Sequence, residues 1–79
     1  MSRKLNRIKT VLVDQGRTNK WLAEQLRKDP ATVSKWCTNT SQPSLEVMMS
    51  IAKLLNVEMN DLVRLEEMPD PAIKAVTNN

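Results

Sequence analysis

The sequence has few of the residue types from which enzyme and metal sites are built. Among its 79 residues there is no histidine, tyrosine or phenylalanine, and cysteine and glycine occur once each. One thiol, that of Cys37, and no imidazole cannot make a zinc site from ordinary nitrogen and sulfur ligands, nor can one thiol form an internal disulfide. No glycine-rich phosphate loop and no nucleophile paired with a base is recognisable. We therefore expect a protein that is not an enzyme and that carries no metal or other cofactor.

Long apolar runs are absent as well. No stretch approaches the roughly 20 apolar residues that a membrane-spanning helix needs. The basic start MSRKLNR lacks the apolar stretch and the cleavage site of a signal peptide. The single unpaired cysteine suits a reducing compartment. We expect a cytoplasmic protein with no membrane partner, and the length allows one small domain.

Charge is distributed unevenly along the chain. Residues 1–36 contain nine basic and three acidic residues, whereas residues 37–79 contain three basic and six acidic residues. A basic half beside an acidic half is the pattern expected of a protein with one face for a polyanion. On charge alone, a solvated surface with a chance asymmetry is the alternative.

The single glycine and the four prolines divide the chain into segments in which apolar residues have helical spacing. Residues that suit helix ends are the N-caps Thr18, Asp29 and Ser44, the first-turn Pro30, and the terminating residues Gly16 and Asn56. The sequence therefore predicts an all-α protein with short helices over about residues 3–15, 19–26, 30–38, 45–55 and 59–65. No segment resembles a strand. Residues 1–65 form the predicted domain, and residues 66–79 a polar, loosely held tail.

The predicted third helix has two different faces. Val33, Trp36 and Cys37 fall on one side and are expected to pack in the core. The opposite side is small and polar, with Lys35 at its centre. Such a face can enter a DNA major groove without steric collision, although an ordinary amphipathic helix also has a polar outer face.

The surrounding pattern is more specific than this helix alone. The stretch LAEQLRKDPATVSKWCTNTSQPSLEVMMSIAKLLNVEMNDL, residues 22–62, resembles the Cro/repressor (XRE) helix-turn-helix family, which has a lambda-repressor-like fold of five helices. The matching positions are Leu22-Ala23, Leu26, Thr32-Val33-Ser34, Trp36, Pro43-Ser44-Leu45, Ile51-Ala52, Leu55 and Val57. The resemblance extends over about residues 5–65 and implies a double-stranded DNA-binding regulator.

The resemblance also implies roles for individual residues. The base-contacting positions of the recognition helix are occupied by Pro30, Ala31, Thr32 and Lys35. The phosphate-contacting positions are occupied by Asn19, Lys28, Ser34, Thr38, Asn39 and Thr40. Arg27, in the turn before the recognition helix, is near enough to assist electrostatically. Phosphate contacts position a protein on the duplex, whereas base contacts read the sequence.

Three positions depart from the family pattern. An arginine of the first helix and a glutamate of the third, which often form an ion pair, are replaced by Leu12 and Cys37, so an apolar contact is expected there. Arg27 replaces a glycine, and we expect a somewhat different turn. Pro30 replaces a residue able to hydrogen-bond to a base, so sequence preference depends more on Lys35 and on DNA shape.

Other residues leave alternatives open. Trp21 replaces a polar residue, and it packs against a neighbouring loop or the tail, or else contributes to a dimer contact. Met48, Met49 and Met59 are expected in the core, with an adaptable interface as the alternative.

The function predicted from the sequence is a sequence-specific transcriptional regulator, a repressor or an autoregulator, of bacterial or phage origin and associated with the nucleoid. The resemblance implies a homodimer on a palindromic operator, with the dimer contact from the fifth helix and the tail. The alternative is an antitoxin-like interaction module whose tail, residues 66–79, folds on a partner protein.

Overall fold

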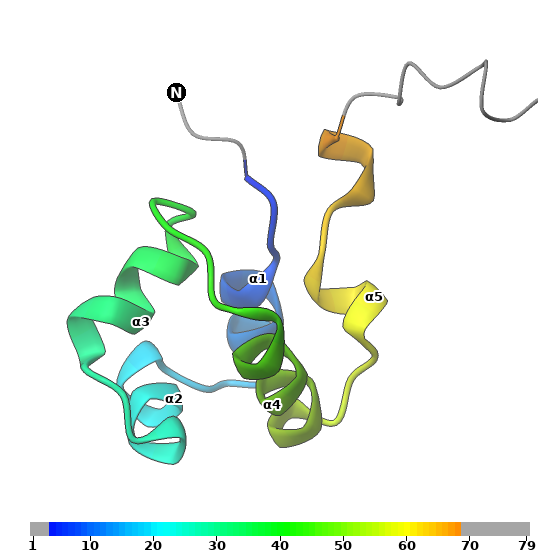
Figure 1. The fold of residues 1–79 in the computed structure, drawn as a ribbon. Coiled ribbons are helices and arrows are strands. Elements are labelled where there is room, and N and C mark those ends of the chain that lie inside the picture. The colour runs from blue at the N-terminus through cyan, green and yellow to red at the C-terminus, as the bar shows by residue number, and fades with distance from the viewer. Residues whose placement is uncertain (1–3, 69–79) are drawn as a thin grey trace, which may run out of the picture.

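The computed structural model describes residues 4–68 of the chain (Figure 1). The helices within this range are α1 (Ile8–Asp14), α2 (Asn19–Leu26), α3 (Pro30–Cys37), α4 (Leu45–Leu55) and α5 (Met59–Leu62), followed by the 3₁₀ helix η1 (Leu65–Glu67). The described residues contain no strand beyond an isolated antiparallel bridge between Asn6 and Val63. The predicted all-α class is therefore confirmed for this part of the chain.

The three predicted N-caps are confirmed. The hydroxyl of Thr18 accepts a hydrogen bond from the Trp21 N–H at 3.0 Å, and a carboxylate oxygen of Asp29 accepts from Ala31 at 2.9 Å. The Ser44 hydroxyl accepts from the Val47 N–H at 3.2 Å. Each cap satisfies one of the backbone donors that the first turn of a helix leaves unpaired, and this local chemistry fixes where α2, α3 and α4 begin.

Three residues with positive φ follow helices α1, α2 and α4. Gly16 has a φ of 68°, as expected, and Asn56 ends α4 with a φ of 55°. Arg27 ends α2 with a φ of 56° and a ψ of 44°, the left-handed conformation that glycine adopts most easily. Our expectation of a different turn is therefore wrong, because Arg27 itself adopts the conformation that a glycine would provide.

The first helix begins later than predicted. It starts at Ile8, and the preceding residues lie outside the helix and pair with the chain that follows α5. The N–H of Arg7 donates to the Leu62 carbonyl at 2.9 Å, and the N–H of Arg64 donates to the Leu5 carbonyl at 2.8 Å. For the same reason α5 ends at Leu62 instead of continuing to residue 65. Figure 1 shows these two segments side by side at one end of the molecule.

A network of buried amides joins the N-terminal segment to the end of α3. Asn6 and Asn39 are 3% and 7% exposed. Hydrogen bonds of their side-chain and backbone groups join them to each other and to neighbouring residues. The Asn6 N–H donates to Asn39 Oδ1 at 2.9 Å, and Asn39 Nδ2 donates to the Asn6 carbonyl at 3.2 Å. Asn6 Nδ2 also donates to the Trp36 carbonyl at 2.9 Å and to Gln42 Oε1 at 2.7 Å. Because buried polar groups are stable only when paired, this network fixes the loop after α3.

One hydrophobic core joins all five described α-helices. Its buried members are Ile8, Leu12, Leu22, Ala23, Val33, Trp36, Cys37, Met48, Ile51, Ala52, Leu55 and Leu62. The predicted inner face of α3 and the burial of Met48 are thus confirmed. Met59 packs partly buried against this core, but Met49 is 52% exposed, so the core assignment of Met49 is wrong.

Part of the predicted tail lies within the described residues. Glu66 is in η1 and its carboxylate accepts a hydrogen bond from Arg7 Nη2 at 2.7 Å. Its pKa is lowered by a backbone hydrogen bond and then by the Arg7 side chain. Residues 69–79, which include most of the tail expected to bind a partner protein, lie outside the described residues.

Candidate nucleic-acid interface

The two helices α2 and α3 pack against each other and are joined by the three-residue turn 27–29 (Figure 1). The left-handed Arg27 directs the chain out of α2, and the N–H of Lys28 donates to the Ala23 carbonyl at 3.0 Å. Asp29 then caps α3, whose first residue is Pro30. This arrangement holds α3 across the end of α2 and leaves its outer side uncovered by the other described helices.

The four predicted base-contacting residues are all exposed on α3. Pro30, Ala31 and Thr32 form its first turn, and Lys35 follows one turn later. Val33, Trp36 and Cys37 face inward, at 0%, 6% and 8% exposure. Packing of the inner face therefore presents the four residues together, with Lys35 as the one cation on α3.

The phosphate-contact candidates lie around this face. Lys28 and Ser34 are exposed in the turn and on α3. Beyond the end of α3, the hydroxyls of Thr38 and Thr40 are 2.9 Å apart, and Thr38 Oγ1 also donates to the Ser34 carbonyl at 3.1 Å. The exposed residues Lys28, Ser34, Thr38 and Thr40 thus form a polar border along the turn, α3 and the following loop.

Asn39 does not belong to that border. Its Oδ1 accepts hydrogen bonds from the Asn6 N–H and from Gln42 Nε2, and its Nδ2 donates to the Asn6 carbonyl. With this buried amide occupied inside the protein, the side chain links two segments of the fold. We therefore correct its predicted role and exclude it from the phosphate-contact candidates.

Asn19 opens α2 and is partly buried at the edge of α3. The thiol of Cys37 donates a hydrogen bond to Asn19 Oδ1 at 3.2 Å. Holding the amide oxygen in this way leaves Nδ2, a donor, available for an anion. The helix N-terminus adds a positive electrostatic potential and unpaired backbone N–H groups at the same place. The sequence did not predict this hydrogen bond between α2 and α3, because Asn19 and Cys37 are 18 positions apart.

Cys37 and Leu12 are both buried in the core, as expected for an apolar replacement of an ion pair. Burial raises the pKa of the Cys37 thiol, and the positive charge of Lys9 opposes this effect. The thiol therefore remains protonated at neutral pH and can donate to Asn19.

Trp21 packs against the loop between α1 and α2. The guanidinium carbon of Arg17 lies 4.4 Å from the centroid of the Trp21 ring, within the range of a cation–π contact. Of the two interpretations of Trp21, packing against a neighbouring loop is confirmed.

Other kinds of site were sought in the same residues. No group of three or more potential metal ligands occurs between residues 4 and 68. Over this range no helix is long and apolar enough to cross a membrane.

Comparison with known proteins agrees with this geometry. A helix-turn-helix family model matches residues 8–62 of the chain. Among solved structures, the chain is similar to one described as "a putative DNA-binding protein from Bacteroides fragilis", with 53% sequence identity and a TM-score of 0.75. The similarity covers 76% of this chain and 97% of that chain. No curated protein matches. The chain therefore belongs to the helix-turn-helix family of Cro/repressor (XRE) type, a family of DNA-binding transcription regulators.

Proposed function

We propose that this protein is a sequence-specific double-stranded DNA-binding transcriptional regulator, a repressor or an autoregulator, that inserts α3 into the major groove. The observation that carries the proposal is the outer face of α3, where small exposed side chains surround Lys35. Small side chains allow the helix backbone to come near the base edges, which a bulky face would prevent.

Lys35 is the principal base-reading residue in this proposal. Its ammonium group can donate to O6 and N7 of guanine, while the methyl groups of Ala31 and Thr32 can contact thymine methyls. Pro30 has no N–H and offers only apolar contact. With one charged reader on the helix, sequence-dependent DNA shape contributes a larger share of the specificity.

The contacts to the DNA backbone come from both sides of α3. Asn19 Nδ2 and the N-terminus of α2 bind one phosphate, and Lys28 lies in the intervening turn. Ser34, Thr38 and Thr40 contact the backbone near the other end of α3. These contacts set the register and orientation of the protein without reading bases.

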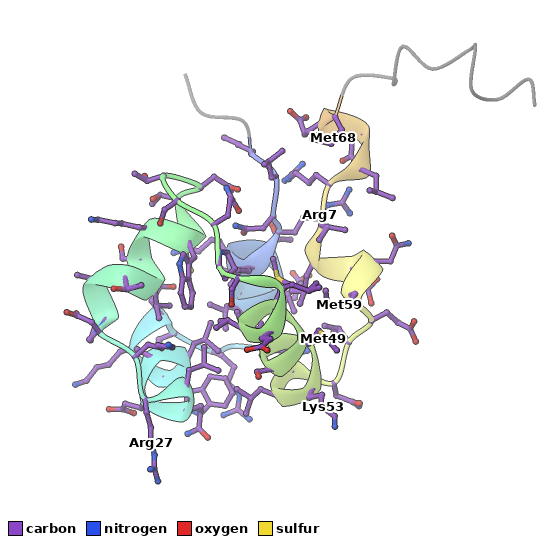
Figure 2. The ribbon with its side chains drawn as sticks, viewed as in Figure 1. Arg7, Arg27, Met49, Lys53, Met59 and Met68 are labelled. Carbon is purple, nitrogen blue, oxygen red and sulfur yellow. The ribbon has the colours of Figure 1, made fainter. Side chains whose placement is uncertain are left out.

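We further propose a homodimer on a palindromic operator, with half-sites about 34 Å apart. Exposed apolar groups support a contact on the side of α4 and α5. Met49 is 52% exposed and Leu45 69% exposed. Figure 2 shows Met49 and Met59 near each other between α4 and α5, where they line a shared hollow. A second copy would cover this apolar surface.

Selection of bound duplexes from a random pool tests the proposed function. A sequence-specific dimer enriches a site with two inverted half-sites one helical turn apart. Enrichment of a single half-site would retain DNA reading but contradict the dimer. A pool that shows no enriched sequence, although the protein binds DNA, would contradict sequence-specific regulation.

A further inference from the structure

A basic cavity lies next to the end of α3 and shares only Thr38 with the candidate DNA-contacting residues retained above. It has a volume of about 380 Å³ and is lined by residues of the N-terminal segment, α1, the end of α3 and the chain after α5. Figure 1 shows the N-terminal segment between the loop after α3 and the chain after α5. Its volume is within the range of small-ligand pockets.

Four cationic side chains line this cavity, and no acidic side chain does. They are Lys4, Arg7, Lys9 and Arg64. The nearby Glu66 carboxylate lies 2.7 Å from Arg7 Nη2 and 3.9 Å from Arg64 Nη1, so it compensates one charge of this group. No ion pair of Lys4 or Lys9 occurs among residues 4–68. The excess of positive charge predicts an anion with more than one negative charge or several acceptor oxygens.

Two hydrogen-bond donors in the same group have no partner. The Nε atoms of Arg7 and Arg64 are buried and unpaired within the described part of the chain. Buried N–H groups are rarely left unpaired, because the loss of water is not compensated. Both guanidinium groups therefore keep an unpaired donor beside their contacts with Glu66, although the two Nε atoms themselves are shielded from solvent and face the cavity only if the side chains move. Figure 2 shows Arg7 extending beside the chain that follows α5.

Part of the neutral lining is polar and held in place by hydrogen bonds. Thr38 is exposed at the end of α3, and Asn39 beside it is fixed by its buried hydrogen bonds to Asn6. A preorganised wall reduces the conformational entropy that ligand binding would remove. Guanidinium and ammonium groups with such polar neighbours match the several oxygens of a tetrahedral phosphate. A ligand carboxylate fits less well, because the Glu66 carboxylate already occupies part of the two guanidinium groups.

We propose that this cavity, formed by Lys4, Arg7, Lys9 and Arg64 at the end of α3, binds a phosphate group. The group comes from the DNA backbone beside the recognition helix or from a free phosphorylated molecule. The pocket itself does not depend on the proposed function, and only the DNA source rests on it. Binding of a phosphate group from either source changes the surroundings of Thr38, which is also a candidate for DNA backbone contact.

Titration of the full-length protein with inorganic phosphate, against chloride at equal ionic strength, tests the site by amide NMR. Saturable shifts are expected at Lys9, Thr38 and Arg64. Lys9→Gln should weaken binding about fivefold, the effect of one charge at contact distance in water. Lys53→Gln, an exposed lysine near the far end of α4, is the matched control and should leave binding unchanged. Glu66→Gln should strengthen binding, because it frees both guanidinium groups.

The source is distinguished by the salt dependence of binding to a duplex. If a backbone phosphate occupies the cavity, Lys9→Gln lowers the slope of log K against log salt by about 0.9, and Lys53→Gln does not. A slope unchanged by Lys9→Gln, with saturable phosphate binding, identifies a free phosphorylated ligand. If the protein binds phosphate but no duplex, the proposed function is refuted and the proposed phosphate site in the cavity stands. Equal behaviour of phosphate and chloride, or equal effects of both lysine variants, would overturn the site.

Discussion

Arg27→Gly is predicted to make the protein more stable. Arg27 ends α2 with a φ of 56° and a ψ of 44°, a conformation that costs a residue with a Cβ roughly 1–2 kcal/mol. Glycine removes this strain but loses more conformational entropy on folding, by about 0.5–1 kcal/mol. The middle values of the two ranges give an expected net gain of about 0.75 kcal/mol. Figure 2 shows the Arg27 side chain pointing away from the protein, so little packing is lost with it.

Thermal unfolding followed by circular dichroism measures this gain. A domain of this size shifts its Tm by about 4–8 °C per kcal/mol, so Arg27→Gly should raise Tm by about 3–6 °C. Arg27→Ala is the control, because it removes the same side chain and charge but keeps the left-handed strain. If Arg27→Ala stabilises the protein as much as Arg27→Gly does, the stabilisation does not come from the backbone and the reasoning is wrong.

Two further predictions concern the polar groups that the core encloses. Asn6→Ala should lower the free energy of unfolding by about 1–3 kcal/mol, because it leaves the buried Trp36 carbonyl and Gln42 side chain without their donor, and urea unfolding measures this. An unchanged denaturation midpoint would contradict it. Because the pKa of Cys37 is raised, the folded thiol keeps its proton after the unfolded thiol has lost it. Its contribution to stability is therefore complete below the ordinary thiol pKa of about 8.5 and is lost as the pH rises through the raised value. Stability measured across this range should fall more for the native protein than for Cys37→Ala, and parallel curves would refute the assignment.

Local chemistry explains why much of the helical structure was predictable. Thr18, Asp29 and Ser44 each hydrogen-bond to a backbone N–H two or three residues further along, so the information for these helix starts is contained in a few neighbouring residues. The inner face of α3 followed from helical periodicity in the same way.

Long-range pairing explains what was missed. Leu5 continues the apolar spacing of α1, so the sequence predicted helix there, but Asn6 hydrogen-bonds to Asn39, 33 residues away. That pairing holds residues 4–7 outside the helix, and nothing in the local sequence reports it. The same pairing turned Asn39 inward and removed it from the predicted phosphate contacts. Met49 was placed in the core because most residues of α4 are apolar. The core cannot cover all of this apolar surface, so some of it, including Met49, stays exposed.

The candidate site was predictable to the extent that one face of α3 defines it. Exposure of Pro30, Ala31, Thr32 and Lys35 follows from burial of the opposite face. The hydrogen bond from Cys37 to Asn19 and the basic cavity depend on how separate helices pack, and the sequence alone gives no distance between them.

Competition between the selected operator and a random duplex, measured for Lys35→Ala, tests the central claim most directly. Lys53→Ala, which removes an equal charge from α4, serves as the control, and its oligomeric state is compared with that of the native protein because Lys53 lines the hollow proposed for the dimer contact. If Lys35 reads a base, its removal costs roughly 1–3 kcal/mol on the operator, much less on the random duplex, and relaxes preference at one base pair. An equal loss on both duplexes would show that Lys35 contacts only the backbone and that α3 does not read the site through it.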